Sequence, residues 1–397
     1  MRPQPIGARM LARNRHAMNS SETETPARTE RAHARLERNA QDRFEPVYRV
    51  LEDAIGAHVF PGCAFGVFAE GKVVLADALG RFTYQPESPA VEPETAYDLA
   101  SVSKVVGTTA MAMLLWQRGQ LDLDTLVADL LPGFVVGRVD GLLARRVRLR
   151  HLLAHSSGLP AYVKLFESCK TPAELLQGCL RLPLEAEPGT RAEYSDPGFI
   201  LLGKALEIVA GETLDGYLAR EVFAPLGMRG TGYCPAPALR PAIAPTEQDT
   251  WFRHRLIQGE VQDENAWLLG GVSGHAGLFS TVGDLLRFAA ELLRGTQPVE
   301  STALFESRTV EVFRQREPPE GSSRAVGWDT PSEHSSSGRY FSTRSIGHLG
   351  YAGTSLWIDL EAGVAVVLLT NRTWPDRASQ QIRQLRPAFH DAVRLAL

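Results

Sequence analysis

Short apolar runs near both ends of the chain predict β-strands. Residues 64–68 and 71–78 follow one another near the start, and residues 354–359 and 364–370 near the end, with a tight turn inside each pair. Neither pair can make a stable sheet alone. The pattern therefore predicts one mostly antiparallel sheet that is assembled from the two ends of the sequence.

Apolar residues recur at helical spacing in several segments from Phe44 onward, and this spacing predicts helices. It begins at Phe44, and further helices are predicted near residues 102–118, 172–181, 197–210, 213–223 and 281–294, with a closing helix at about 376–396. We expect the first and last helices to pack on the sheet. The predicted fold class is α/β in the broad sense, of the α+β type. A sheet lobe would comprise about 44–100 and 325–397, and a mostly helical lobe about 101–324.

Residues 1–43 lack this periodicity and carry nine arginines and five acidic residues. Such a composition predicts a flexible basic arm before one folded domain at 44–397. The arm has no apolar run of the roughly 7 to 15 residues found in a secretory signal. No run in the chain approaches the ~20 apolar residues of a membrane span. We therefore expect a cytoplasmic protein without a membrane span, and a periplasmic location stays open if translation starts elsewhere.

The composition argues against nucleic acid as a partner and against a metal site built from cysteines. The 397 residues are 44% apolar and 22% charged, which is typical of a globular protein, and the net charge of −4 gives no general attraction to nucleic acid. The four cysteines lie far apart and predict free thiols rather than a metal site. His151 and His155 stand four residues apart without the glutamate of a zinc-hydrolase motif, and we interpret them as structural.

The first candidate for chemistry is the sequence Ser101-Val102-Ser103-Lys104, at the start of an apolar helix. Residues three apart share a helix face, so Ser101 and Lys104 can meet while Ser103 points elsewhere. A helix N-terminus also favours an oxyanion. Ser101 is therefore the predicted nucleophile, although this pattern alone would also fit a helix cap followed by a solvated lysine.

The second candidate is the segment 194–198, which precedes another apolar helix. A tyrosine directed into a cleft can take a proton from serine if an ammonium group lowers its pKa, and Lys104 could do this for Tyr194. In the alternative interpretation, Tyr194 packs on a loop and Asp196 caps the helix.

The third candidate is the glycine-rich segment 347–354, which leads into a predicted strand. Its glycines would let the backbone run close to a ligand, and an N–H at the strand edge could complete an oxyanion hole with the N–H of Ser101. Alone, the segment also fits a glycine-rich turn that contains a buried His348.

In this order, the three motifs resemble those of the serine beta-lactamase and penicillin-binding-protein superfamily. The resemblance is to the class C beta-lactamase-related branch, which includes D-amino-acid peptidases and family VIII carboxylesterases. That branch carries S-x-x-K, then Y-x-N or Y-S-x, then K-T-G or H-x-G. Residues 152–160, 274–280 and 353–357 add to the similarity, which spans roughly 45–395.

The resemblance implies an active site between a sheet lobe and a helical lobe, and an acyl-enzyme on Ser101 that water hydrolyses without a metal or organic cofactor. Lys104 and Tyr194 would move the proton of Ser101, and which of the two is the general base stays open. The resemblance assigns the oxyanion hole to the backbone N–H groups of Ser101 and Tyr351, and substrate contacts to Asp196, His348 and Gly350.

Two departures from the family pattern bear on the substrate. His348 replaces a lysine, so a substrate carboxylate loses a contact worth roughly 1.5 to 3 kcal/mol, unless Arg344 supplies the charge. With an unperturbed pKa, His348 would become cationic near pH 5.5. Asp196 replaces an asparagine, and a carboxylate about 4 Å from Lys104 would keep that lysine protonated, which favours Tyr194 as the base.

These departures favour an esterase or broad-specificity serine hydrolase. A D-amino-acid peptidase or carboxypeptidase comes next and a weak beta-lactamase third, each acting on a small-molecule ester, amide or lactam, with the oligomeric state open. An α/β-hydrolase would need G-x-S-x-G, and residues 271–275 lack its last glycine. A non-catalytic, penicillin-binding-like binding or assembly protein is the alternative from another class, and the presence of all three catalytic candidates argues against it.

Overall fold

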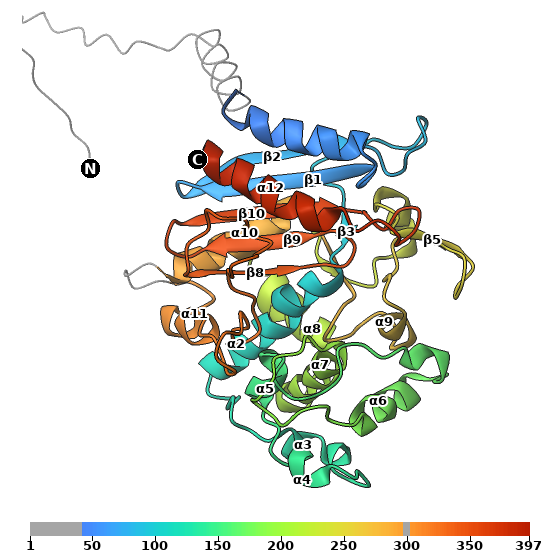
Figure 1. Cartoon of the computed structure of the whole chain (residues 1–397), viewed down its shortest axis with the longest axis vertical. Coiled ribbons are helices and arrows are strands. Elements are labelled where there is room, and N and C mark those ends of the chain that lie inside the picture. The colour runs from blue at the N-terminus through green and yellow to red at the C-terminus, as the bar shows by residue number, and fades with distance from the viewer. Residues whose placement is uncertain (1–41, 297–301) are drawn as a thin grey trace, which may run out of the picture. The chain divides into compact units, whose positions relative to one another are not determined.

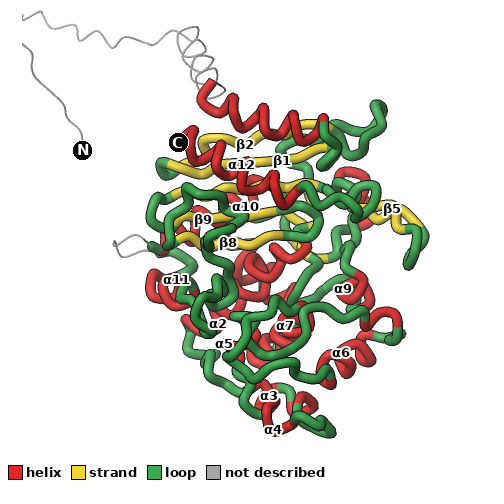
Figure 2. Tube along the Cα trace, in the orientation of Figure 1, coloured by secondary structure: helices red, strands yellow, loops and turns green. Residues whose placement is uncertain are grey.

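A five-stranded antiparallel sheet joins the two ends of the folded chain (Figures 1 and 2). Its strands, in spatial order, are β2 (Lys72–Gly80), β1 (Gly62–Ala69), β10 (Val364–Thr370), β9 (Ser355–Asp359) and β8 (Ser345–Leu349). Strand β1 pairs with β10 from Cys63 opposite Thr370 to Phe68 opposite Ala365. The predicted sheet made from both ends of the sequence is therefore confirmed.

This computed structural model describes residues 42–296 and 302–397. Residues 43–397 form one compact unit. The basic arm predicted at 1–43 lies almost wholly outside the described residues. Within the described residues, none of the helices is at once long enough and apolar enough to cross a membrane.

Helices cover both faces of the sheet (Figure 1). The first described helix, at residues 42–56, and α12 (Ile382–Ala396) share one apolar cluster with Phe65 and Trp357. Helix α10 (Val282–Gly295) packs on the other face with Ala64 and neighbouring inward side chains. Because both faces are covered, every residue of β10 is buried.

The remaining helices form the second lobe. They are α2 (Ala110–Gln117), α3 (Val127–Leu130), α4 (Gly141–Ala144), α5 (Leu149–Leu153), α6 (Pro172–Arg181), α7 (Asp196–Ala210), α8 (Leu214–Leu218), α9 (Glu264–Leu268) and α11 (Ser307–Phe313), together with short 3₁₀ turns. Helices α6 and α7 match their predictions. The helix predicted at 102–118 is instead divided into a 3₁₀ turn η1 (Ala100–Val102), a π-helical segment η2 (Lys104–Thr109) and α2.

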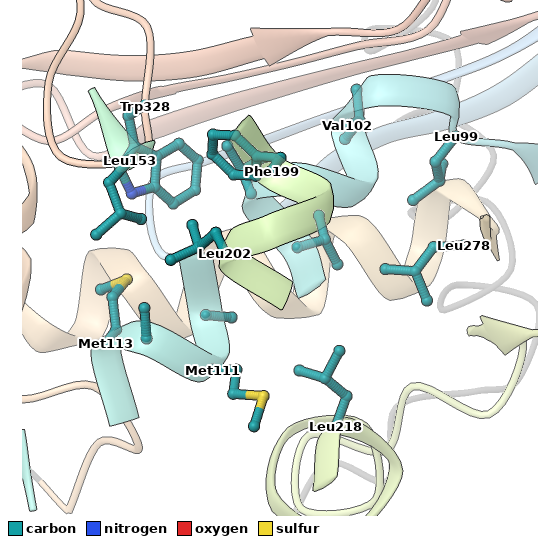
Figure 3. Close-up of a cluster of buried hydrophobic side chains, with 14 of the residues drawn as sticks. Leu99, Val102, Met111, Met113, Leu153, Phe199, Leu202, Leu218, Leu278 and Trp328 are labelled. Atoms are coloured by element: carbon teal, nitrogen blue, oxygen red, sulfur yellow. The ribbon is translucent and has the colours of Figure 1, made fainter. Parts of the chain in front are cut away.

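The structure also contains two small sheets that the sequence pattern did not predict, and the strand at 97–98 in one of them leads into the Ser101 turn. Strands β3 (Tyr97–Asp98), β7 (Leu278–Ser280) and β4 (Gly232–Tyr233) form one, and β5 (Glu247–Asp249) pairs with β6 (Arg255–Ile257) in the other. An apolar cluster lies around the start of the η2–α2 segment, where Leu99, Val102, Leu278 and Phe199 come together (Figure 3).

Candidate active site

Ser101 and Lys104 meet as their spacing predicts. The Lys104 ammonium donates a hydrogen bond of 2.9 Å to Ser101 Oγ. Ser103 is fully buried, and its hydroxyl accepts a hydrogen bond of 3.1 Å from the backbone N–H of Leu278 on β7. Ser101 therefore has the lysine partner that a nucleophile needs, and Ser103 has a structural partner instead.

Lys104 is the charged centre of the site, and its side chain is 0% exposed. Besides Ser101, its ammonium donates to Asp196 Oδ1 at 2.7 Å and to the backbone oxygen of His275 at 2.9 Å. These three acceptors use all three of its N–H bonds. Burial disfavours the charge, but the partners of the ammonium, the Asp196 carboxylate first among them, outweigh it, so the pKa of Lys104 is raised. Lys104 is an ammonium at neutral pH.

Tyr194 lies against this ammonium, with Lys104 Nζ 4.8 Å from the centroid of its ring. Burial and, to a lesser extent, the Asp196 carboxylate raise the pKa of Tyr194 by more than Lys104 and Ser101 lower it, so the net shift is opposite to the lowering that was predicted. Its hydroxyl oxygen is buried and makes no hydrogen bond of regular geometry within the described residues. The resting side chain is therefore a neutral phenol next to both Ser101 and Lys104.

The start of helix α7 positions Tyr194 and Asp196. Ser195 is the N-cap, because its Oγ accepts a hydrogen bond of 3.1 Å from the Gly198 N–H and donates to the Pro160 oxygen at 2.8 Å. The alternative interpretation, in which Asp196 caps this helix, was wrong. The Asp196 carboxylate accepts a hydrogen bond from Lys104 instead. The backbone N–H of Ser195 donates to His155 Nδ1 at 2.9 Å.

His151 and His155 have structural partners in this region. The ring of His155 stacks on Phe199 at 4.9 Å and lies 4.5 Å from the ring of Tyr194. His151 Nδ1 accepts a hydrogen bond from the Arg148 N–H. Among the residues that the structure describes, no group of three or more His, Cys, Asp or Glu side chains is arranged to hold a metal ion.

A strained residue precedes the predicted nucleophile. Ala100 has φ of +47°, a conformation that costs a non-glycine residue roughly 1 to 3 kcal/mol. Asp98 holds it there: one carboxylate oxygen accepts from the Ala100 N–H at 2.8 Å and the other from the Gln262 N–H at 2.7 Å. Burial raises the pKa of Asp98 to about 6. This carboxyl group links the Ser101 turn to the loop before α9.

His348 lies behind the site. It is 4% exposed, its Nδ1 is 2.8 Å from the Leu349 oxygen, and its ring is 5.8 Å from that of Tyr194. Burial and the positive charges of Lys104 and Arg324 hold the pKa of His348 well below its usual range. The expectation that it becomes cationic near pH 5.5 was therefore wrong. Arg344, the candidate for a replacement charge, pairs instead with Glu311 at 3.2 Å.

The glycines of the third motif fit against the protein itself. A Cβ at Gly350 would lie 1.9 Å from Thr354 Oγ1 and 2.4 Å from the Leu99 oxygen, and one at Gly347 would lie 2.4 Å from the Trp357 ring. The backbone of this segment does run close to other atoms, as predicted. The neighbours that the structure shows belong to the protein itself. Gly350 thus fixes the β8–β9 turn against the residues just before Ser101.

Tyr351 lies at this turn and is 49% exposed. Its carbonyl oxygen accepts a hydrogen bond of 2.7 Å from Arg372, whose guanidinium lies 4.3 Å from the centroid of the Tyr351 ring. Its backbone N–H donates to no backbone acceptor within the described residues. The peptide group that carries this N–H is held through its other end, because the Gly350 oxygen accepts a hydrogen bond of 2.6 Å from Arg386. The donor is thus held in place and available, as an oxyanion hole requires.

Ser101, Tyr194, Asp196 and Tyr351 share a cleft of about 440 Å³. The cleft is also lined by Ala100, Ala161, Tyr162, Lys164, Trp251, Gln262, Asp263, Glu264, His275, Ala276 and Arg377. His348 and Gly350, predicted to contact substrate, are not among its lining residues.

Several residues of the cleft carry no signal in the sequence that points to a functional site. Tyr162, Trp251, Asp263 and Arg377 lie in loops or at a helix start, without a spacing that relates them to Ser101. Among the other lining residues, His275 lies in the segment 274–280, which the sequence analysis had named for its similarity to the family. An aspartate before an apolar helix is a readable cap signal, and Asp263 does cap α9, but that signal does not indicate a cleft.

Comparisons with known proteins identify the family of the chain. Residues 36–388 match the family model described as Beta-lactamase. A protein of Salmonella typhi with the printed name "Putative D-alanyl-D-alanine carboxypeptidase" is 33% identical over 305 residues, which cover 70% of this chain and 69% of the relative.

Solved structures give the same result for the fold. The structure described as "EstCE1, a hydrolase with promiscuous acyltransferase activity" has a TM-score of 0.71 and 25% identity, over 90% of this chain and 99% of that one. A penicillin-binding protein homologue from Caulobacter crescentus has a TM-score of 0.69 and 18% identity, over 90% and 98% of the two chains.

Proposed function

The chain belongs to the beta-lactamase family and is a serine hydrolase of that family, and from this premise we propose that it cleaves carboxylic esters through an acyl-enzyme on Ser101. The observation that carries the proposal is the hydrogen bond from Lys104 Nζ to Ser101 Oγ in the cleft. Lys104 and Tyr194 are the proposed acid–base groups, and the N–H groups of Ser101 and Tyr351 the proposed oxyanion hole.

The proposed acylation step uses Tyr194 as the proton carrier. Lys104 is fully engaged by three acceptors and has no lone pair to offer while it is protonated. As Ser101 Oγ bonds to the carbonyl carbon, its proton passes to the Tyr194 oxygen, and the Tyr194 proton passes to the departing alcohol oxygen. The Lys104 charge stabilises the partly ionised phenol during this exchange. Water reverses these transfers and releases the acid.

The charges of the cleft support a neutral ester over a carboxylate-bearing lactam. Lys104 pairs with Asp196, and Arg377 pairs with Glu247 and Glu264, each at 2.6 Å. His348 is buried and its pKa is lowered, so it offers no cation. A substrate carboxylate would therefore compete with existing ion pairs. The 33% identity to a protein with a carboxypeptidase name supports peptidase activity as the second candidate.

Covalent trapping tests the nucleophile. We expect a fluorophosphonate probe to label Ser101, and Ser101→Ala to abolish turnover of short-chain nitrophenyl esters. Ser103→Ala is the matched control, and we expect it to keep appreciable activity. A label on Ser103 or Ser273 would overturn the assignment. A chromogenic cephalosporin and D-alanyl dipeptides, assayed beside the esters, rank the three substrate classes.

A further inference from the structure

Two buried arginines bind the backbone at Tyr351 and beside it. Arg386 of α12 is 6% exposed, and its Nη2 donates hydrogen bonds to the Gly350 oxygen at 2.6 Å and to the Thr354 oxygen at 2.8 Å. Arg372 is 4% exposed, and its Nε donates to the Tyr351 oxygen at 2.7 Å. These acceptors are backbone carbonyls, and within the described residues neither arginine has a carboxylate at ion-pair distance.

Burying these charges without an anion costs free energy. Burial first, and then the positive charges of Arg372 and Arg383, lower the pKa of Arg386 to about 9, so Arg386 is still a cation at neutral pH. By contrast, the side chain of Arg253 is 3% exposed and pairs with Asp249. Stability of the fold gives no reason for an unpaired buried guanidinium, because an apolar side chain of similar size would avoid the cost. The charge therefore points to a task at the peptide group that it binds.

The Gly350 oxygen and the Tyr351 N–H belong to one planar peptide group, which is trans. In a trans peptide these two groups point in opposite directions, so Arg386 binds the end of the peptide that faces away from the N–H. A cation at the carbonyl oxygen draws electron density toward that end and makes the N–H a stronger donor. Among the described residues the N–H has no backbone acceptor, and Tyr351 lines the same cleft as Ser101.

The turn that Arg386 binds is also attached to the residues before Ser101. The Gly350 N–H donates to the Thr354 oxygen at 2.8 Å, so Arg386 contacts both ends of a closed turn. The Thr354 hydroxyl donates at 2.9 Å to the oxygen of Leu99, two residues before Ser101. Arg386 therefore holds a turn whose position relative to Ser101 is fixed by a hydrogen bond.

We propose that Arg386 and Arg372 are positioning residues for the oxyanion hole, and that their guanidinium charges hold the Tyr351 N–H in place and strengthen it as a donor to the oxyanion. The inference rests on the proposed function, because an oxyanion forms only if Ser101 attacks the carbonyl carbon. Neither arginine is among the residues that line the cleft, so each acts through the backbone. The charge on the oxyanion develops in the transition state and is absent from the bound ester. We therefore expect the two arginines to affect the rate of acylation and not the binding of substrate.

Arg386→Gln tests the first of the two charges. The glutamine amide can still donate a hydrogen bond, while the positive charge is removed. Stopped-flow acylation by a nitrophenyl ester measures the acylation rate constant and the dissociation constant of the ester separately. The rate constant should fall about ten- to a hundredfold, less than the roughly 10² to 10³ for complete loss of an oxyanion donor, and the dissociation constant should stay within about twofold.

Arg386→Lys separates the charge from the shape of the guanidinium. Lysine keeps the positive charge on a side chain of different geometry, so this variant should recover most of the acylation rate that Arg386→Gln loses. Equal losses in the two variants would overturn the proposal. Arg138→Gln is the matched control, because the Arg138 side chain is 2% exposed and donates to the Leu180 backbone oxygen at 3.0 Å outside the cleft. The control should change neither constant.

The outcomes separate this inference from the proposed function. Wild-type acylation in folded Arg386→Gln, or a loss that is seen only as weaker binding of the ester, would overturn the positioning role. If Arg386→Gln does not fold, Arg372→Gln decides through the same two constants, and an unchanged acylation rate would again overturn the proposal. Ester hydrolysis that persists in Ser101→Ala would instead contradict the proposed function itself.

Discussion

At the scale of single residues, the Asp196 carboxylate favours the protonated form of Lys104, the lysine next to Ser101. Asp196 Oδ1 lies 2.7 Å from Lys104 Nζ, and that contact offsets the burial that would otherwise remove the proton from the lysine. The family pattern has an asparagine at this position in many members, so the aspartate alters the protonation of the site as well as its hydrogen bonding.

We therefore expect Asp196→Asn to lower the pKa of Lys104. The carboxylate stabilises the ammonium form, so its removal leaves burial to dominate and favours the neutral amine. The basic limb of the kcat/KM profile on a nitrophenyl ester should move to lower pH than in the wild type. The measurement is that profile between pH 6 and 10.5, and an unmoved basic limb would contradict the role of Asp196.

Tyr194→Phe separates chemistry from stability. The Tyr194 hydroxyl is buried without a regular hydrogen bond, so its removal should leave the melting temperature equal or higher. Loss of the proton carrier should lower kcat/KM by about 10² to 10⁴. Tyr340→Phe, at a residue 43% exposed, is the control and should affect neither quantity. Wild-type kcat/KM in folded Tyr194→Phe would exclude the acid–base role.

At the scale of elements, the N-terminus of α7 connects a capping interaction to the chemistry. Ser195 caps the helix, and its two neighbours in the sequence are Tyr194 and Asp196. The hydroxyl also binds the Pro160 oxygen, so the cap is attached to the loop that follows α5. Loss of this cap should displace both neighbours.

Ser195→Ala should reduce the free energy of unfolding by about 1 to 2 kcal/mol and also lower kcat/KM. Thr171→Ala is the matched control, because Thr171 caps α6 through the Glu174 N–H and does not line the cleft. The control should lose a similar stability and keep its activity. Urea unfolding and ester hydrolysis measure the two effects, and equal activity losses in both variants would contradict the coupling.

At the scale of the whole molecule, residues from both ends of the sequence complete one apolar layer. Phe389 of α12 is fully buried, and its ring lies 6.4 Å from that of Phe65 on β1. The layer is complete only when α12 packs on the sheet, because Phe389 lies in that helix, and the sheet itself pairs β1 with β10 from the other end of the chain. Long-range pairing of this kind slows folding.

Phe389→Ala should therefore cost about 3 to 5 kcal/mol of stability, because it opens a cavity in this layer. Leu395→Ala, on the same helix at a residue 68% exposed, should stay within about 0.5 kcal/mol of the wild type. The folded fraction of Phe389→Ala should keep the activity per labelled Ser101 of the parent enzyme. A small stability loss would show that α12 contributes little to the sheet layer.

The sequence by itself determined what depends on neighbours along the chain. Periodicity predicted the strands at both ends, helices α6 and α7, and the shared face of Ser101 and Lys104, because backbone geometry fixes which positions face the same way. The order of the three motifs indicated the family. These features need no knowledge of how distant segments pack.

Only the tertiary structure decided the contacts between distant residues and the electrostatics that follow from burial. Two of the three hydrogen-bond partners of Lys104 lie 92 and 171 residues away, at Asp196 and His275, and no local pattern encodes such pairs. The low pKa of His348 comes from burial beside Lys104, which its sequence neighbours do not reveal. Asp263 likewise lines the cleft only because the fold brings distant loops together. Desolvation and ion pairing depend on this packing in three dimensions.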